Sequence, residues 1–175
     1  MIFNTYAWFI YATQVATSIT AHVSSWNIEF VTGNEEIVTN IEIDLDRIYP
    51  GMEDYEKIVE VHNKGETKAK LSYEMLSFEI LGEKFEVGEN LTSEELENKI
   101  EQEYPFKINI EIDDYDITEE KGKGTFKITV SWPYESGDDE LDTYWGNKAY
   151  EFYELHPDEN SIELKLTLIA TQRNE

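Results

Sequence analysis

The sequence contains no cysteine, which excludes disulfide bonds, thiolate nucleophiles and cysteine-ligated zinc or iron–sulfur centres. Basic residues are also scarce, because 14 Lys and Arg face 38 Asp and Glu and the formal net charge is -24 at pH 7. Nucleic-acid-binding proteins neutralise phosphates with positive charge, so DNA and RNA are not expected partners. Glycine (9) and proline (4) are few, and no linker, repeat or low-complexity tract is visible. The length of 175 residues, together with these features, predicts a single domain.

Charge of either sign is missing from residues 1–28, although 30% of the whole chain is charged. Random placement would leave such a stretch uncharged with a probability of about a few in 100,000, so charge is selected against there. A membrane span needs roughly 20 mostly apolar residues. Polar residues interrupt this segment from Thr13 onward, and the longest apolar run covers only residues 6–12. No transmembrane segment is therefore expected.

The start of the chain has one feature of a processed secretory signal. Thr5, Tyr6 and Ala7 form a small-x-small triplet of the kind that precedes signal cleavage, but the basic segment and long apolar core are missing. Residues 1–7 are therefore interpreted as the remnant of a removed signal peptide or as an added starting segment. The alternative, an ordinary buried N-terminal strand, stays open.

Strands dominate the rest of the chain. Hydrophobic residues make up 40% and aromatic residues 13% of the sequence, enough apolar surface to form a core. Eight or nine runs alternate apolar and polar residues with period 2, and turn residues such as Pro50, Gly51 and Gly82 separate them. The spacing predicts an antiparallel β-sandwich, jelly-roll-like, rather than βαβ units. The apolar runs lie near residues 19–30, 41–45, 58–61, 71–75, 78–80, 106–112, 126–132 and 162–170.

Two short helical insertions are expected between the strands. Thr92 followed three residues later by Glu95 forms a capping box, the signature of a helix N-terminus. In the second segment, Asp142 is expected to cap a short helix whose apolar face includes Trp145 and Ala149. Both helices are expected to pack at an edge or end of a sheet.

Sequence motifs for catalysis are absent. The three histidines, His22, His62 and His156, lie in unrelated segments without HExxH, and no Gly-x-Ser-x-Gly, GxGxxG or GxxxxGK pattern occurs. Pairs of carboxylates are too abundant to single out an acid/base pair. The chain is therefore not expected to be an enzyme, and no cofactor is expected.

A bound cation is the one ligand that the acidic residues suggest. Calcium favours several oxygen ligands on a flexible loop, but neither of two acidic clusters has the spacing of an EF-hand loop. A solvated acidic loop is the better interpretation of both clusters. The calcium candidates are Asp138, Asp139 and Asp142, near Glu140, and a second cluster consists of Asp113, Asp114 and Asp116.

Three segments, considered together, resemble the TasA and camelysin family of secreted bacterial matrix proteins. They are TYAWF at 5–9, IYPG at 48–51 leading to EVHNKG at 60–65, and NSIELKLTLIATQ at 160–172. The resemblance implies a secreted jelly-roll protein at the cell surface or outside the cell. It also implies head-to-tail assembly into fibres of a biofilm matrix, in which the N-terminal segment of one subunit supplies a strand to its neighbour.

The uncharged N-terminus has the composition that such a donor strand needs, because buried charge without a partner would be costly. We therefore expect residues 8–17 to contain the donor strand and its linker, and residues 18–175 to form a single β-sandwich domain. The pattern does not decide which face of the donor is buried. The expected donor residues are Trp8, Phe9, Ile10, Tyr11, Ala12, Thr13, Gln14 and Val15.

Two alternatives to a fibre subunit stay open. The resemblance to camelysin implies a secreted metalloprotease, although only His22, His62 and His156 with scattered carboxylates could bind a metal. A monomeric adhesive or carbohydrate-binding sandwich is the other alternative, with aromatic residues at 132–134 and 144–145 stacking on sugar rings. Core packing explains these aromatic residues equally well.

Overall fold

The structure, a computed structural model, describes residues 22–28, 36–65, 67–113, 116–117 and 122–173. This part of the chain forms nine strands in two sheets and two helices, which confirms a mainly β fold with two helices. Sheet A has the order β1 (His22–Ile28), β3 (Tyr55–Asn63), β8 (Lys123–Ser131) and β6 (Lys107–Asp113). Sheet B has the order β2 (Glu36–Leu45), β9 (Ile162–Arg173), β4 (Lys68–Ile80) and β5 (Glu83–Glu86), and β7 (Asp116–Ile117) also pairs with β4.

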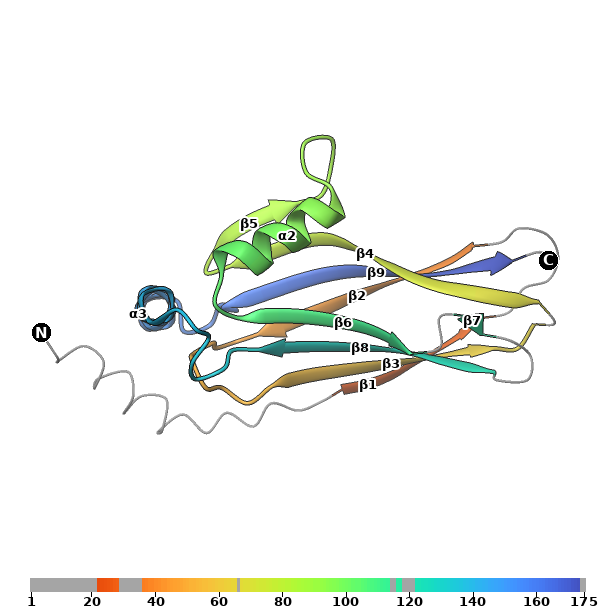
Figure 1. The fold of residues 1–175 in the computed structure, drawn as a ribbon, viewed down its shortest axis with the longest axis horizontal. Coiled ribbons are helices and arrows are strands. Elements are labelled where there is room, and N and C mark those ends of the chain that lie inside the picture. Colours follow the sequence, from red (N-terminus) through yellow and green to blue (C-terminus); the bar gives the residue numbers. More distant parts are fainter. Residues whose placement is uncertain (1–21, 29–35, 66, 114–115, 118–121, 174–175) are drawn as a thin grey trace, which may run out of the picture.

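All strand pairs are antiparallel except one. β1 pairs in parallel with β3, from His22 opposite Lys57 to Ile28 opposite Asn63. β1 and β6 therefore form the two opposite edges of sheet A, with β3 and β8 between them (Figure 1).

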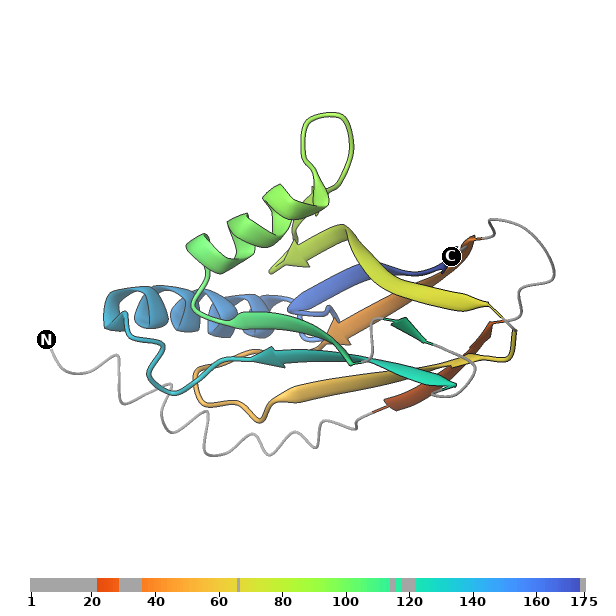
Figure 2. The ribbon, with the colours of Figure 1, turned by 45° about the vertical axis from the view of Figure 1, so that its right-hand side comes forward.

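The alternating apolar residues of the two sheets meet in one hydrophobic core. Strands with one buried face place every second side chain inside, and this is seen along β8, where Phe126, Ile128 and Val130 are completely buried. Figure 2 shows the two layers from a second direction, with α3 (Asp139–Leu155) at one end and α2 (Ser93–Glu103) beside β4. No helix of the described residues is long and apolar enough to cross a membrane.

β4 joins two of the expected apolar runs into one strand. Its pairing with β9 shifts in register between Met75 and Ser77, so the strand contains a bulge. The extra residue, Leu76, is partly exposed, whereas Met75 and Phe78 on either side are buried. The bulge explains why the apolar alternation of residues 71–75 resumes out of phase at residue 78.

The first helix begins as expected. The Thr92 side chain accepts a hydrogen bond from the Glu95 backbone N–H, and the Glu95 carboxylate accepts one from the Thr92 N–H at 2.8 Å. Leu96 and Ile100, one turn apart, are buried against the core. The capping box and the apolar pair therefore set both the start of α2 and the face that it buries.

The second helix corrects the expectation in two respects. Its N-cap is Asp138, which accepts hydrogen bonds from the backbone N–H groups of Glu140 and Leu141, and not Asp142. With 17 residues, α3 is also longer than a short insertion. Asp142 lies inside the first turn and is buried, because its carboxylate serves a different purpose, described below.

Candidate functional site

The outer edge of β6 is the feature of this fold that can accept another chain. β6 pairs with β8 from Lys107 opposite Ser131 to Asp113 opposite Thr125. In the described part of the chain, no other strand pairs with β6. Such an edge carries a row of backbone N–H and C=O groups that are available to a further strand.

The inner side chains next to this edge are incompletely covered. On the inner face of sheet A, the β6 residues Ile108 and Ile110 lie directly opposite Val130 and Ile128 of β8. The β8 residues are fully buried, whereas the β6 isoleucines are only half-buried, as is Ile112 further along. The core is therefore closed under β8 but stays partly open to solvent at β6.

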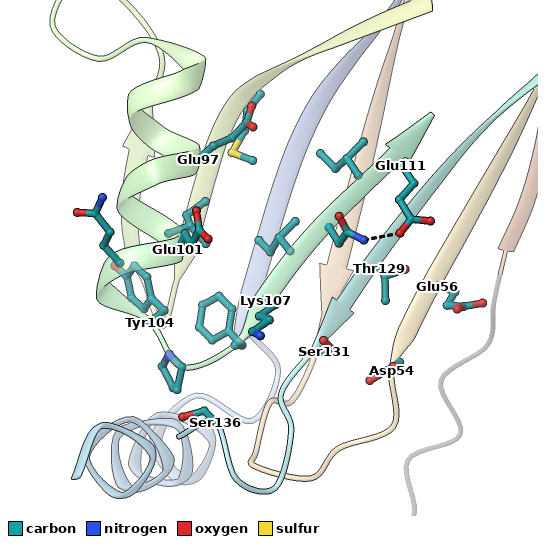
Figure 3. Close-up of a pocket in the computed structure, with 18 of the residues that line it drawn as sticks. Asp54, Glu56, Glu97, Glu101, Tyr104, Lys107, Glu111, Thr129, Ser131 and Ser136 are labelled. Carbon is teal, nitrogen blue, oxygen red and sulfur yellow. Dashed lines mark hydrogen bonds between the residues drawn. The ribbon is translucent and has the colours of Figure 1, made fainter. Parts of the chain in front are cut away.

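A groove of about 820 Å³ follows this edge and is called the β6 groove from here. It curves around β6, from the outer face of sheet A to the space beneath α2 (Figure 3). The inward-facing residues of β4 and β6 give the groove an apolar side, glutamates of α2 lie above it, and its side on the outer face of sheet A is polar. The apolar residues that line it are Tyr73, Met75, Ile100, Tyr104, Pro105, Phe106, Ile108, Ile110 and Leu141.

The charged groups that line the β6 groove are mainly acidic. Six carboxylates face two lysines, and one of these, Lys127, lies 2.6 Å from Glu56 in an ion pair that raises the pKa of the lysine. In Figure 3, Glu97 and Glu101 face the groove from α2, Lys107 begins β6, and Glu111 lies toward its other end. The carboxylates are Asp54, Glu56, Glu97, Glu101, Glu111 and Asp138. An inserted strand that carried negative charge would be repelled.

The opposite wall of the groove, β4, is largely closed to a new strand. β7 pairs with β4 at Ala69 and Lys70, and β5 pairs with residues 77–80. Between these ladders, the Ser93 hydroxyl of α2 accepts the Met75 backbone N–H at 2.8 Å. The Tyr73 hydroxyl also donates to Glu97 of α2 at 3.2 Å. Because α2 occupies this edge, β6 is the accessible edge of the groove.

A buried carboxylate fixes α3 at the end of the groove. Asp142 Oδ1 accepts a hydrogen bond from the Trp132 indole N–H at 2.8 Å. Its other oxygen accepts two bonds from Ser136, from the backbone N–H at 3.1 Å and from the hydroxyl at 2.9 Å. Trp132 is fully buried and Asp142 nearly so. This cluster ties the loop of residues 133–138 and the first turn of α3 to the end of β8.

The three calcium candidates do not share one site. Asp138 caps α3, Asp142 faces inward to Trp132, and Asp139 is exposed on the first turn. Among the described residues, no group of three or more His, Asp or Glu side chains is arranged to hold a metal ion. In the second cluster, Asp113 and Asp116 are exposed, and Asp114 lies outside the described residues. Calcium binding stays a prediction.

The histidines are not brought together. His62 lies 3.3 Å from Glu60 on β3, and His156 lies 3.1 Å from Glu159 after α3. The side chain of His22 lies outside the described part of the structure. His62 and His156 therefore each lie close to a single carboxylate, and neither is grouped with the other histidine or with further ligands.

The aromatic residues considered for sugar stacking are divided between core and surface. Trp132 is fully buried, so its ring is not available to a ligand. Tyr134 is 49% exposed and Tyr144 is 52% exposed. The ring of Trp145 instead packs at 4.7 Å from that of Tyr104, and its indole N–H donates to the Glu103 carbonyl at 3.2 Å. These residues do not form one exposed aromatic surface.

The expected donor residues, 8–15, lie outside the described residues. The structure gives the position of the strand that follows them in the sequence, because β1 begins at His22 on the edge of sheet A opposite to β6. Comparison with known proteins gives no further guide, since no family model, curated protein or solved structure matches the chain.

The β6 groove itself is not predicted by the sequence. Residues 106–112 alternate apolar and polar residues in the same way as residues 126–132, yet the first run lies at an edge and the second in the middle of a sheet. The only local signal is the polar set on β6, where charged residues at 107, 111 and 113 flank Asn109. Charged residues are common on edge strands, but they do not identify one.

Proposed function

We propose that the protein is the structural subunit of an extracellular fibre, such as a biofilm matrix filament. In this proposal, residues 8–15 of one copy insert as an additional strand along β6 of the next copy. The observation that carries the proposal is the edge of β6, with which no further described strand pairs, together with its half-buried isoleucines. An added strand would pair with that edge through its backbone and cover the isoleucines with its side chains.

The topology supports exchange between copies. β1, which begins at His22, forms one edge of sheet A, and the β6 edge is three strand spacings away, about 14 Å. The strand that follows the donor in sequence and the acceptor strand therefore lie on opposite edges of sheet A, and a strand inserted from another copy would extend the sheet to the order β1-β3-β8-β6-donor. Because the two surfaces differ, the contact is head-to-tail and repeats from copy to copy.

The dimensions and chemistry of the two parts agree. β6 has seven residues and the donor has eight, so both span about 25 Å when extended. The donor contains no charged residue, so the acidic lining of the groove does not repel it. Other segments of this acidic chain would meet like charge in the same place.

The strand pairing also supports a jelly roll as the finer description of the fold. β2 pairs with β9, β3 with β8 and β4 with β7. Strands near the start of the domain thus pair with strands near its end, and successive pairs move inward along the sequence. A long hairpin that is wrapped into two sheets has this order.

Electron microscopy of the purified full-length chain tests the proposal, in combination with one substitution in the groove. Ile110→Lys places a charge among the apolar residues that the donor covers, and its flexible side chain can reach solvent in the free subunit. We expect the wild-type chain to form fibres and Ile110→Lys to remain monomeric with an unchanged circular dichroism spectrum.

The matched control is Ile58→Lys. Ile58 is also half-buried in sheet A, but it lies on the outer face of β3 and does not line the β6 groove. This variant should form fibres as the wild type does. Fibres from Ile110→Lys, or a wild-type chain that stays monomeric, would contradict the proposal.

A further inference from the structure

The outer face of sheet B carries a row of uncharged residues that the strand registers bring together. β2, β9 and β4 are neighbours in this sheet, and their outward side chains form rows across the three strands (Figure 1). Val38 lies opposite Ile169, which in turn lies opposite Ser72. Among the large hydrophobic residues on the described strands, Val38 is the most exposed, at 51%, and Ile169 is also partly exposed. An apolar centre is therefore open to solvent in the middle of this face.

The uncharged row is a local feature and not the average of this acidic chain. Three rows further along the same strands, Asp44, Glu163 and Glu79 lie opposite one another, so that every outward residue there is acidic. The rows that flank the uncharged row contain one lysine and two carboxylates. They are Glu36–Thr171–Lys70 on one side and Asn40–Thr167–Glu74 on the other. The uncharged row and these two flanking rows are called the sheet B band from here.

The band is complementary to itself about a two-fold axis that runs across the strands at the uncharged row. Such an axis places Val38 and Ile169 of one copy on the same residues of a second copy. It also exchanges the two flanking rows. Lys70 and Glu74 lie on β4 at equal distances from Ser72, so Lys70 of each copy then faces Glu74 of the other. The contact would contain two pairs of opposite charge around an apolar centre.

The remaining polar groups of the band do not oppose this contact. About the same axis, Glu36 faces Asn40 of the second copy, so no like charges face each other within the three rows. The Thr167 hydroxyl already donates to the Asn40 side-chain oxygen at 3.0 Å, which reduces the cost of covering both groups. An axis along the strands would instead place Glu163 on Glu163 of the second copy, and these charges would repel.

We infer that a second copy of this chain docks on the sheet B band, face to face about the two-fold axis across the strands. This contact goes beyond the proposed strand exchange and does not depend on it, because it uses the outward side chains of sheet B and no backbone edge. A contact of this symmetry joins two copies and then closes, whereas head-to-tail insertion continues from copy to copy.

The size of the band sets the strength of the contact. Three strands and three rows of outward residues cover about 14 Å by 20 Å, or about 300 Å² on each copy. Stable complexes bury about 800 Å² on each partner, so the dissociation constant should be on the order of 1 mM. The contact therefore becomes significant where copies are held close together, because a high effective concentration compensates for weak affinity.

Charge reversal at the two positions of β4 tests the inference. The full-length chain with Phe9→Asp and Ile10→Asp serves as the parent, because charge on the proposed donor prevents strand exchange from contributing. We expect amide NMR shifts that grow with protein concentration to cluster at the sheet B band. Lys70→Glu and Glu74→Lys should each weaken self-association about fivefold, because each replaces two attractive contacts with two repulsive ones.

An equal mixture of the two reversed proteins is the decisive measurement. The reversed position 70 of one copy then faces the reversed position 74 of the other, and opposite charges meet again at both pairs. The mixture should associate with the affinity of the parent to within about twofold. Labelling one of the two proteins with ¹⁵N and titrating it with the unlabelled other measures this affinity directly.

The matched control is Glu154→Lys, which makes the same charge change at an exposed position on α3. This variant should associate at least as well as the parent, because it lowers the net negative charge outside the contact. Glu74→Lys lowers the net charge equally and should still weaken association. The inference is overturned if no shifts depend on concentration or if the shifts cluster elsewhere. It is also overturned if Glu74→Lys behaves as Glu154→Lys does, or if the mixture associates no better than its components.

Discussion

Removing the Asp142 carboxylate should destabilise the protein strongly, because this group satisfies buried donors where α3 joins the core. Asp142→Ala leaves the Trp132 indole N–H, which is fully buried, without its acceptor at 2.8 Å. The two donors of Ser136 lose the same partner, but Ser136 is only half-buried and can bond to water instead.

The expected loss of stability follows from how far the Trp132 and Ser136 donors are buried. A buried donor left unsatisfied costs about 1–3 kcal/mol, and the more accessible Ser136 contacts add about 1 kcal/mol. We therefore expect Asp142→Ala to lower the free energy of unfolding by about 3 kcal/mol. For a domain of this size, that corresponds to a fall in Tm of about 9 °C.

Thermal and urea unfolding followed by circular dichroism measure this effect. The matched control is Asp139→Ala, which removes an exposed carboxylate from the same helical turn and should cost about 0.5 kcal/mol. The loss of stability in Asp142→Asn should lie between the losses in Asp142→Ala and Asp139→Ala, since the amide of asparagine keeps one acceptor oxygen. If Asp142→Ala and Asp139→Ala were equally stable, the carboxylate would not be what holds α3 in place.

Three further predictions concern charge. Partial burial and the carboxylates of Glu163 and Glu42 raise the pKa of Asp44, so Asp44→Asn should gain about 0.5 kcal/mol in urea unfolding at pH 7. This gain should shrink as pH falls through the raised pKa and vanish at pH about 3, where the carboxyl is neutral in both the folded and the unfolded state; a gain that persisted there would contradict the cause. Burial, reinforced by Glu83, raises the pKa of Tyr104 to about 12. The free energy of unfolding should therefore fall as pH rises from about 10 to 12, and it should fall less in Tyr104→Phe than in the wild type. Parallel pH curves for the two proteins would refute this. Because the chain carries a formal charge of -24, light scattering by fibres should increase as salt or calcium is added, and a flat or falling signal would count against repulsion between filaments.

The sequence predicted the parts of the fold that local chemistry determines. The capping box at Thr92 fixed the start of α2, because it satisfies backbone groups within four residues of each other. The alternating runs located the strands for a similar reason, since each strand must bury one face. The bulge in β4 was not predicted, because residues 71–75 and 78–80 were expected as two separate runs and the structure joins them in one strand.

What the sequence could not supply depends on distant partners. Asp138 and Asp142 both stand before the apolar face of α3 and are equally good caps by local criteria. Only the position of Trp132, ten residues before Asp142, decides that Asp142 turns inward. The parallel pairing of β1 with β3 is likewise invisible in either strand alone.

The β6 groove could not be predicted from the sequence for the same reason. Ile110 and Ile128 have the same kind of sequence surroundings and lie opposite each other, yet one is half-buried and the other fully buried. The difference arises because, among the described strands, β8 has a neighbour on both sides and β6 has one on a single side. Edge position is a property of the assembled sheet, so the acceptor could be recognised only in the structure.

Mixing two variants, neither of which should assemble alone, tests the central claim most directly. The full-length variant Phe9→Asp with Ile10→Asp keeps an open groove but has a defective donor, and Ile110→Lys keeps its donor but has a defective groove. Each should be monomeric alone by light scattering coupled to size-exclusion chromatography. Together they should form a complex of one copy of each, twice the mass of one chain, which grows no further. A mixture that stays monomeric, or either variant that forms fibres alone, would contradict strand exchange through the β6 groove.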